Sequence, residues 1–100
     1  MDFPFTRDRF THTLLQRDGA VCLVERTNHD TGSVHWEVVR LHWERERVGP
    51  NGALFPAGER YPTGNDWGTD GWTYTSLADA EWRYRDLLAP KPEKGGSAHV

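Results

Sequence analysis

The stretch ERYPTGNDWGTDGWTYTSLADAEWRYRDLL, residues 59–88, decides the fold of this chain. It opens with a glycine-rich segment that carries Trp67 and Trp72, and β-favouring residues continue to position 75. Ser76 is a natural N-cap for the helix-favouring segment that follows. The stretch therefore predicts a loop, a short strand at 72–75 and a helix, in that order.

The predicted helix has one apolar face. Its apolar side chains recur at helical spacing, and Pro90 ends it. This stripe comprises Leu77, Ala80, Tyr84, Leu87 and Leu88. We expect the stripe to pack on a sheet, and because Trp82 lies off the stripe, Trp82 becomes a candidate contact residue.

Two strands are predicted upstream, at residues 20–27 and 34–47, joined by the turn-forming segment 28–33. Residues 10–16, before an Asp-Gly turn signal, suit either a further strand or a short helical turn. These elements predict an α+β fold: a small antiparallel meander of three or four strands with one C-terminal helix packed on it.

Pairing Thr27 with Val34 makes both faces of the predicted sheet apolar, which a sheet with one solvated face would not need. One face collects Val21, Leu23, Trp36 and Val38, and the other collects Ala20, Cys22, Val24, Val39, Leu41 and Trp43. We therefore expect the helix to cover one face and the loop of residues 49–72 to cover the other. A β-bulge near residues 38–39 is the alternative explanation.

The composition favours a single small domain with an aromatic core. Hydrophobic residues make up 36% of the 100 residues, but five Trp, four Phe and three Tyr supply large buried surfaces. We expect a loosely ordered arm at residues 1–9, one domain at 10–89 and a disordered tail at 90–100. Phe3 and Phe5 of the arm are candidates for docking onto the domain.

Charge and hydropathy exclude several classes of partner. The formal net charge is −3 and neither half of the chain is basic, so duplex DNA is not an expected partner. The longest apolar run, residues 20–24, is far shorter than the about 20 residues of a membrane span. The single cysteine, Cys22, allows no internal disulfide, so a cytoplasmic location is expected.

Catalytic and metal-binding patterns are weak. His35 and His42 lie on opposite faces of one predicted strand, so they cannot share an ion. His29, Asp30 and His35 could meet at the turn, but no cysteine or third histidine joins them to complete a closed zinc site. Nucleophile-elbow and phosphate-loop motifs do not occur. We therefore predict no catalytic residue, no metal and no cofactor. An enzyme would need a polar pocket lined by two or more of His42, Glu59, Asp66 and Asp70.

The remaining functional signal is aromatic, because Trp, Tyr and Arg dominate the energetics of protein interfaces. We expect Trp72 and Tyr74 to be core residues. The candidate contact surface comprises Trp43, Trp67, Trp82, Arg83 and Arg85. An alternative use of aromatic side chains is the stacking of single-stranded bases, with Arg26, Arg40, Arg45 and Arg47 as charged partners.

The deciding stretch also carries a family resemblance. The pattern YPxxxxWGxxGWTYxxLxxA runs from Tyr61 to Ala80, after a strand like that at 36–40 and before a terminal helix with Tyr84 and Leu88. It resembles a group of small uncharacterised tailed-phage proteins over residues 34–88. The resemblance implies an accessory phage product that acts on a host protein, and it carries no established activity or functional residue.

These observations together predict a small non-enzymatic protein-binding module with a protein partner. The resemblance makes that partner a host factor and the host cytosol its location. Binding of single-stranded nucleic acid is the alternative function.

Overall fold

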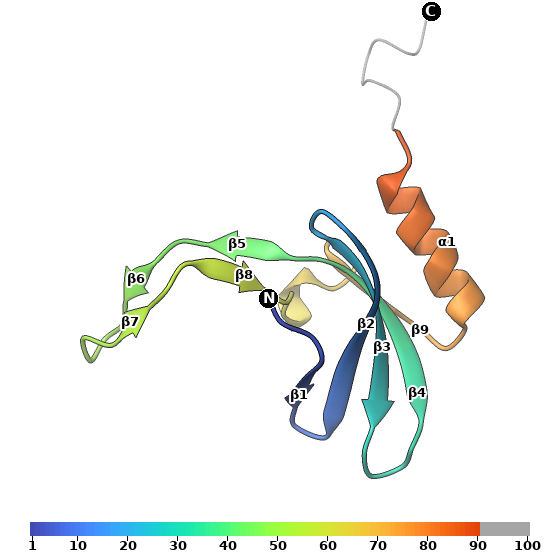
Figure 1. The fold of residues 1–100 in the computed structure, drawn as a ribbon, viewed down its shortest axis with the longest axis horizontal. Coiled ribbons are helices and arrows are strands. Elements are labelled where there is room, and N and C mark those ends of the chain that lie inside the picture. Colours follow the sequence, from blue (N-terminus) through green and yellow to red (C-terminus); the bar gives the residue numbers. More distant parts are fainter. Residues whose placement is uncertain (91–100) are drawn as a thin grey trace, which may run out of the picture.

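The computed structural model describes residues 1–90 and confirms the predicted α+β fold. Five antiparallel strands form the main sheet in the order β1-β2-β3-β4-β9, and one helix packs on it (Figure 1). The elements are β1 (Phe5–Arg7), β2 (Phe10–Asp18), β3 (Val21–Asn28), β4 (Val34–Arg40), β9 (Gly71–Tyr74) and α1 (Leu77–Leu88). The sheet has more strands than the three or four predicted, because residues 5–7 add a strand at one edge.

The predicted pairing of Thr27 with Val34 is present, and both faces of the sheet are buried. The helix-side core contains Val21, Leu23, Val38, Ala80 and Tyr84, with Trp36, Tyr74 and Leu87 packed against it. The loop-side core contains Cys22, Val24, Val39, Leu41 and Tyr61, with Met1, Phe3, Phe5, Leu14 and Trp67 packed against it. The alternation in the sequence therefore separates the two faces correctly for most of these residues.

The cover of the loop-side core differs from the prediction. Of the loop at residues 49–72, Tyr61 and Trp67 reach this core, and the N-terminal residues supply the rest of the cover. Trp43, which the sequence places on this face, is instead 69% exposed. The reason is that β4 ends at Arg40, so the alternation of faces does not continue to Trp43.

Residues 1–9, expected as a loosely ordered arm, contain strand β1. Phe5 of β1 pairs with His12 of β2, and the two aromatic rings stack with centroids 4.5 Å apart. Phe3 and Phe5 pack on the loop-side core, which confirms their predicted docking. Of the tail predicted at residues 90–100, positions 91–100 lie outside the described residues.

The bulge in the sheet lies in β2 and not near residues 38–39. The register with β3 shifts between Leu14 and Gln16, so Leu15 has no partner of its own. Leu14 packs on the loop-side core while Leu15 is exposed. A bulge inserts one extra residue into a strand, and here that residue is Leu15. Leu14, just before the bulge, therefore keeps its side chain on the buried face.

Residues 42–60 leave the sheet as a bent two-stranded hairpin (Figure 1). From here on, the arm means this hairpin and not the N-terminal residues 1–9. Its strands are β5 (His42–Glu44), β6 (Arg47–Val48), β7 (Leu54–Phe55) and β8 (Gly58–Arg60), and β5 pairs with β8 while β6 pairs with β7. The single strand predicted at 34–47 is therefore wrong beyond Arg40. The N–H of Leu41 donates to the carbonyl of Ala20 over 2.8 Å. Ala20 lies in the turn before β3, which begins at Val21, so β3 has no residue left to pair with the chain after Leu41.

The helix begins and ends as predicted. The Ser76 hydroxyl accepts a hydrogen bond of 3.4 Å from the N–H of Asp79, and the helix stops at Leu88, before Pro90. Ala80 and Tyr84 of the predicted stripe are buried against the sheet. Within residues 1–90, no helix combines the length and apolar character that crossing a membrane requires.

Candidate functional site: the elbow cleft

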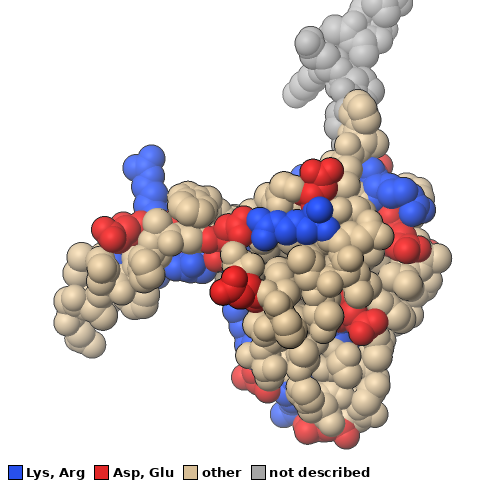
Figure 2. All heavy atoms as spheres, in the orientation of Figure 1, with Lys and Arg blue, Asp and Glu red and all other residues tan. Residues whose placement is uncertain are grey.

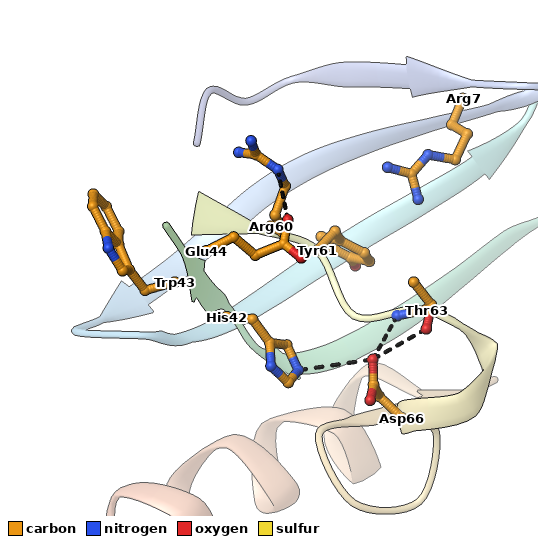
Figure 3. A pocket seen from close by; sticks show the side chains of 8 residues that line it. All are labelled: Arg7, His42, Trp43, Glu44, Arg60, Tyr61, Thr63 and Asp66. Atoms are coloured by element: carbon orange, nitrogen blue, oxygen red, sulfur yellow. Dashed lines mark hydrogen bonds and ion pairs between the residues drawn. The ribbon is translucent and has the colours of Figure 1, made fainter. Parts of the chain in front are cut away.

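A cleft of about 490 Å³ lies where the arm joins the main sheet, and we call it the elbow cleft (Figure 3). Its lining comes from the root of the arm, from β1 and from the loop that holds the 3₁₀ helix η1 (Gly64–Asp66). The lining residues are Arg7, His42, Trp43, Glu44, Arg60, Tyr61, Thr63 and Asp66. Side chains of both charges and two aromatic rings therefore face one solvent-accessible space.

His42 faces two carboxylates at the edge of this cleft. Its Nε2 atom lies 3.8 Å from Oδ2 of Asp66 and 3.4 Å from Oδ2 of Asp70. Figure 3 shows the imidazole of His42 pointing toward Asp66 across the cleft. Three of the four side chains of which the sequence analysis required two or more for a polar pocket therefore converge. Glu59 does not join them, because it binds the amino group of Met1.

Both carboxylates are held by donors on the body of the protein. Oδ2 of Asp66 accepts hydrogen bonds from the Thr63 N–H (2.9 Å) and hydroxyl (3.2 Å), which close a capping box around η1. The bond from the Thr63 N–H is the main cause that lowers the pKa of Asp66. Oδ1 of Asp70 accepts from Nε of Arg40 at 3.0 Å, which leaves Oδ2 facing His42. The loop thus presents two fixed carboxylate oxygens to the arm.

Tyr61 connects the elbow cleft to a buried polar cluster beneath it. Its hydroxyl donates to Oε1 of Glu37 over 2.7 Å, and Nη1 of Arg26 donates to Oε2 over 3.0 Å. Nε2 of His12 lies 3.7 Å from Oε1 of the same carboxylate. Glu37 is only 2% exposed, so these partners compensate a charge that would otherwise be costly to bury.

The pKa values of this cluster follow from its burial. Burial first, and the charge of Glu37 second, raise the pKa of Tyr61 far above its usual value. Burial also lowers the pKa of His12 to about 4, and the guanidinium groups of Arg26 and Arg7 act in the same direction. At neutral pH the phenol of Tyr61 and the imidazole of His12 are therefore both neutral.

Sequence reasoning did not identify this buried cluster. Its one signal is Glu37, a charged residue inside the apolar run of β4, at a position that shares a face with Val39. Tyr61 was noticed as part of the tailed-phage pattern, without a role. The structure supplies that role, because the Tyr61 hydroxyl satisfies the carboxylate that β4 buries.

The predicted contact residues lie on two different elements. Trp43 projects from the arm, whereas Trp82 (57% exposed), Arg83 and Arg85 lie on α1, and Figure 1 shows the arm and α1 on opposite sides of the molecule. Trp67 belongs to neither group, because its ring packs on the loop-side core. The five residues therefore do not form one continuous surface.

Arg83 is engaged within the domain. Its Nε donates to the hydroxyl of Tyr74 over 2.9 Å, and its guanidinium carbon lies 4.9 Å from the ring centroid of Trp72 and 5.4 Å from that of Trp82. These contacts fix Arg83 between the helix and β9. Its guanidinium thus stabilises the packing of α1 on the sheet, and Trp82 is the more accessible part of this surface.

Comparison with known proteins gives no assignment. No protein-family model matches the sequence, and searches of curated proteins and of solved structures return no significant match. The tailed-phage resemblance therefore stays a prediction from the pattern in residues 34–88.

Proposed function

We propose that this protein is a non-enzymatic protein-binding module and that the arm is its main binding element. The observation that supports the proposal most is the exposure of large apolar side chains on a hairpin that leaves the core. Trp43 is 69% exposed, Val48 68% and Leu54 59%. A two-stranded hairpin without a core beneath it is marginally stable in water, so exposed apolar side chains there favour a surface that a partner covers.

The charge pattern of the arm favours a protein partner. Residues 42–60 contain three Arg and three Glu, a net charge of zero without His42, and residues 48–57 contain no charged residue. Figure 2 shows charged side chains along the arm and an uncharged outer end. The arm thus has an apolar outer end, the tip, and charged residues closer to the sheet. This arrangement resembles the apolar centre and polar rim of protein interfaces. The guanidinium of Arg47, 4.7 Å from the ring centroid of Phe55, belongs to this tip.

The class of partner is inferred from the sequence pattern alone. The resemblance to tailed-phage proteins favours an accessory phage protein, and the partner class that fits such a protein is a host factor in the bacterial cytosol. An extended hairpin suits this use, because it can enter a concave surface of a larger protein without rearrangement of the domain.

The alternative of single-stranded nucleic-acid binding has less support. Arg26 and Arg40, two of its four arginines, form ion pairs with Glu37 and Asp70. A phosphate would have to compete with these carboxylates for both guanidinium groups. A salt titration with a labelled oligonucleotide tests this alternative, because binding through phosphates weakens steeply as salt rises.

Affinity capture from lysates of bacterial hosts tests the arm as the binding element. The immobilised protein is compared with three variants: Trp43→Ala and Leu54→Asp on the arm, and Trp82→Ala on the opposite side. We expect a partner that the wild type and Trp82→Ala retain and that both arm variants lose. Loss of about 2 kcal/mol or more per variant, or about 30-fold in affinity, is typical of a residue at the centre of an interface.

The two exposed tryptophans make this comparison a matched one. Trp43→Ala and Trp82→Ala remove the same side chain from exposed positions, and neither residue belongs to the helix-side or loop-side core. A partner that is lost with Trp82→Ala and kept with the arm variants would refute the arm as the binding element. It would assign the binding to α1 instead.

A further inference from the structure

The imidazole of His42 is unsatisfied where it meets the two carboxylates. Its Nε2 atom is shielded from solvent and has no hydrogen-bond partner within residues 1–90, although oxygens of Asp70 and Asp66 lie 3.4 and 3.8 Å away. Hydrogen bonds between nitrogen and oxygen are about 2.7–3.2 Å long. Nε2 of His42 therefore faces both carboxylates and stands too far from either to bond it.

The shorter of these two separations, 3.4 Å, matches the distance between two ligands of one small metal ion. With bonds of about 2.0–2.1 Å, two ligands at the tetrahedral angle are about 3.4 Å apart. Neighbouring ligands of a regular octahedral ion at the same bond length are about 3.0 Å apart. The three ligand atoms of His42, Asp66 and Asp70 all lie within 4.8 Å of one another, so side-chain rotation can bring them onto one ion.

The surroundings of the cluster also resemble those of a metal site. Ligating carboxylates are commonly held by further hydrogen bonds, which fix their orientation. Asp70 is held by Nε of Arg40 through the oxygen that faces away from His42, whereas Thr63 holds Asp66 through Oδ2, the oxygen that faces His42. The elbow cleft opens beside His42 and Asp66, which gives an ion access and room for a solvent ligand.

We propose that His42, Asp66 and Asp70 bind one Zn²⁺ ion with tetrahedral coordination, the fourth position being open to the elbow cleft. One imidazole and two carboxylates are a ligand set that zinc accepts, and zinc can be held by three protein ligands with one position left open. His42 lies at the root of the arm, whereas Asp66 and Asp70 lie in the loop on the body of the protein. The ion therefore joins the arm to the body and restrains the angle between them.

Zinc binding is measured by competition with a chromophoric zinc chelator at neutral pH, using the full chain. We expect one equivalent bound by the wild type. The variants His42→Gln and Asp70→Asn each weaken binding by at least about 100-fold, since loss of a partner that merely orients a ligand already costs 10–100-fold. His29→Gln is the matched control, because it removes an exposed histidine on the β3–β4 turn, and it binds zinc like the wild type.

Two further measurements keep the proposal testable if a variant does not fold. Co²⁺ added to the wild type gives the intense visible absorption of a tetrahedral site, and added Zn²⁺ removes it. Zinc also slows amide hydrogen exchange at residues 42–44 and 58–60, because the ion restrains the root of the arm. These measurements need no partner protein, so their outcome is independent of the proposed binding function.

The proposal is overturned by any of three results. The first is stoichiometric zinc binding that survives in both His42→Gln and Asp70→Asn. The second is a Co²⁺ complex with the weak absorption of an octahedral ion. The third is saturation with zinc that leaves amide exchange at the root of the arm unchanged.

Discussion

The indole ring of Trp67 occupies the space in which any residue other than glycine at position 71 would place its β-carbon. A Cβ built on Gly71 would lie 2.5 Å from Cζ3 of Trp67, well inside van der Waals contact. The indole N–H donates to the hydroxyl of Thr73 over 2.9 Å, which fixes the ring over the start of β9. The spacing WGxxGWT in this sequence is therefore explained by the packing of one ring on one glycine.

Gly71→Ala is expected to destabilise the fold by about 1–3 kcal/mol, because the new methyl group displaces the Trp67 ring. Urea unfolding measures this cost. In a Trp67→Ala background the same substitution costs much less, since the ring that it strikes is absent. The double-mutant cycle of Gly71→Ala and Trp67→Ala therefore shows a coupling energy of about 0.5–3 kcal/mol. Additive effects would contradict the contact.

Tyr61→Phe is expected to cost about 1.5–3 kcal/mol of folding free energy, the range for a hydrogen bond to a charged group. The substitution removes the donor to Oε1 of Glu37 and leaves the phenyl ring in place. Tyr84→Phe is the matched control, because the Tyr84 ring is also buried while its hydroxyl has no hydrogen-bond partner among residues 1–90. Equal unfolding free energies for the two variants would refute the role of the Tyr61 hydroxyl.

The pH dependence of stability is expected to report His12. Its pKa falls from 6.5 to about 4 on folding, so between these values the unfolded chain binds a proton that the folded protein does not. Stability therefore decreases as the pH falls, by about 2 kcal/mol between about pH 7 and about pH 5. Urea unfolding across this range measures the slope.

His12→Gln removes the titrating group and should flatten this slope, even if the variant is less stable at every pH. Thr13→Ala, at an exposed position of β2, changes no titratable group and serves as the control that keeps the slope of the wild type. A slope that persists in His12→Gln would assign the pH dependence to other groups.

The main sheet and the helix were predictable because each depends on local patterns. Alternation in β3 and β4 gave the register of Thr27 with Val34 and the two apolar faces, and Ser76 with Pro90 bounded the helix. The arm was not predictable from alternation. Residues 42–47 keep a strand-like pattern, although β3 has no residue left to pair with them. Alternation alone therefore does not indicate that pairing with the main sheet stops at Leu41.

The candidate site was predictable only in part. His42, Asp66 and Asp70 were recognised as groups that a polar pocket would need, but their convergence depends on the bend at the root of the arm. The cluster around Glu37 unites β2, β3, β4 and the loop after β8, which are far apart in sequence. A single sequence without pairing information cannot bring such residues together.

Removal of the outer arm is expected to leave the domain folded. Replacing residues 46–56 by Asn-Gly closes β5 onto β8 with a two-residue turn, which suits a tight hairpin. The change in unfolding free energy should be within about 1 kcal/mol, because none of the removed residues belongs to either core. Urea unfolding and near-UV circular dichroism measure the outcome.

Leu41→Ala provides the contrast at the base of the same arm. Leu41 is part of the loop-side core, so its truncation should cost about 2–5 kcal/mol. If the shortened arm costs as much as Leu41→Ala, the arm contributes to folding and its exposed side chains need no partner to explain them. If the shortened protein is as stable as the wild type, the apolar tip contributes nothing to the fold. Selection for those exposed side chains must then come from what they contact outside this chain.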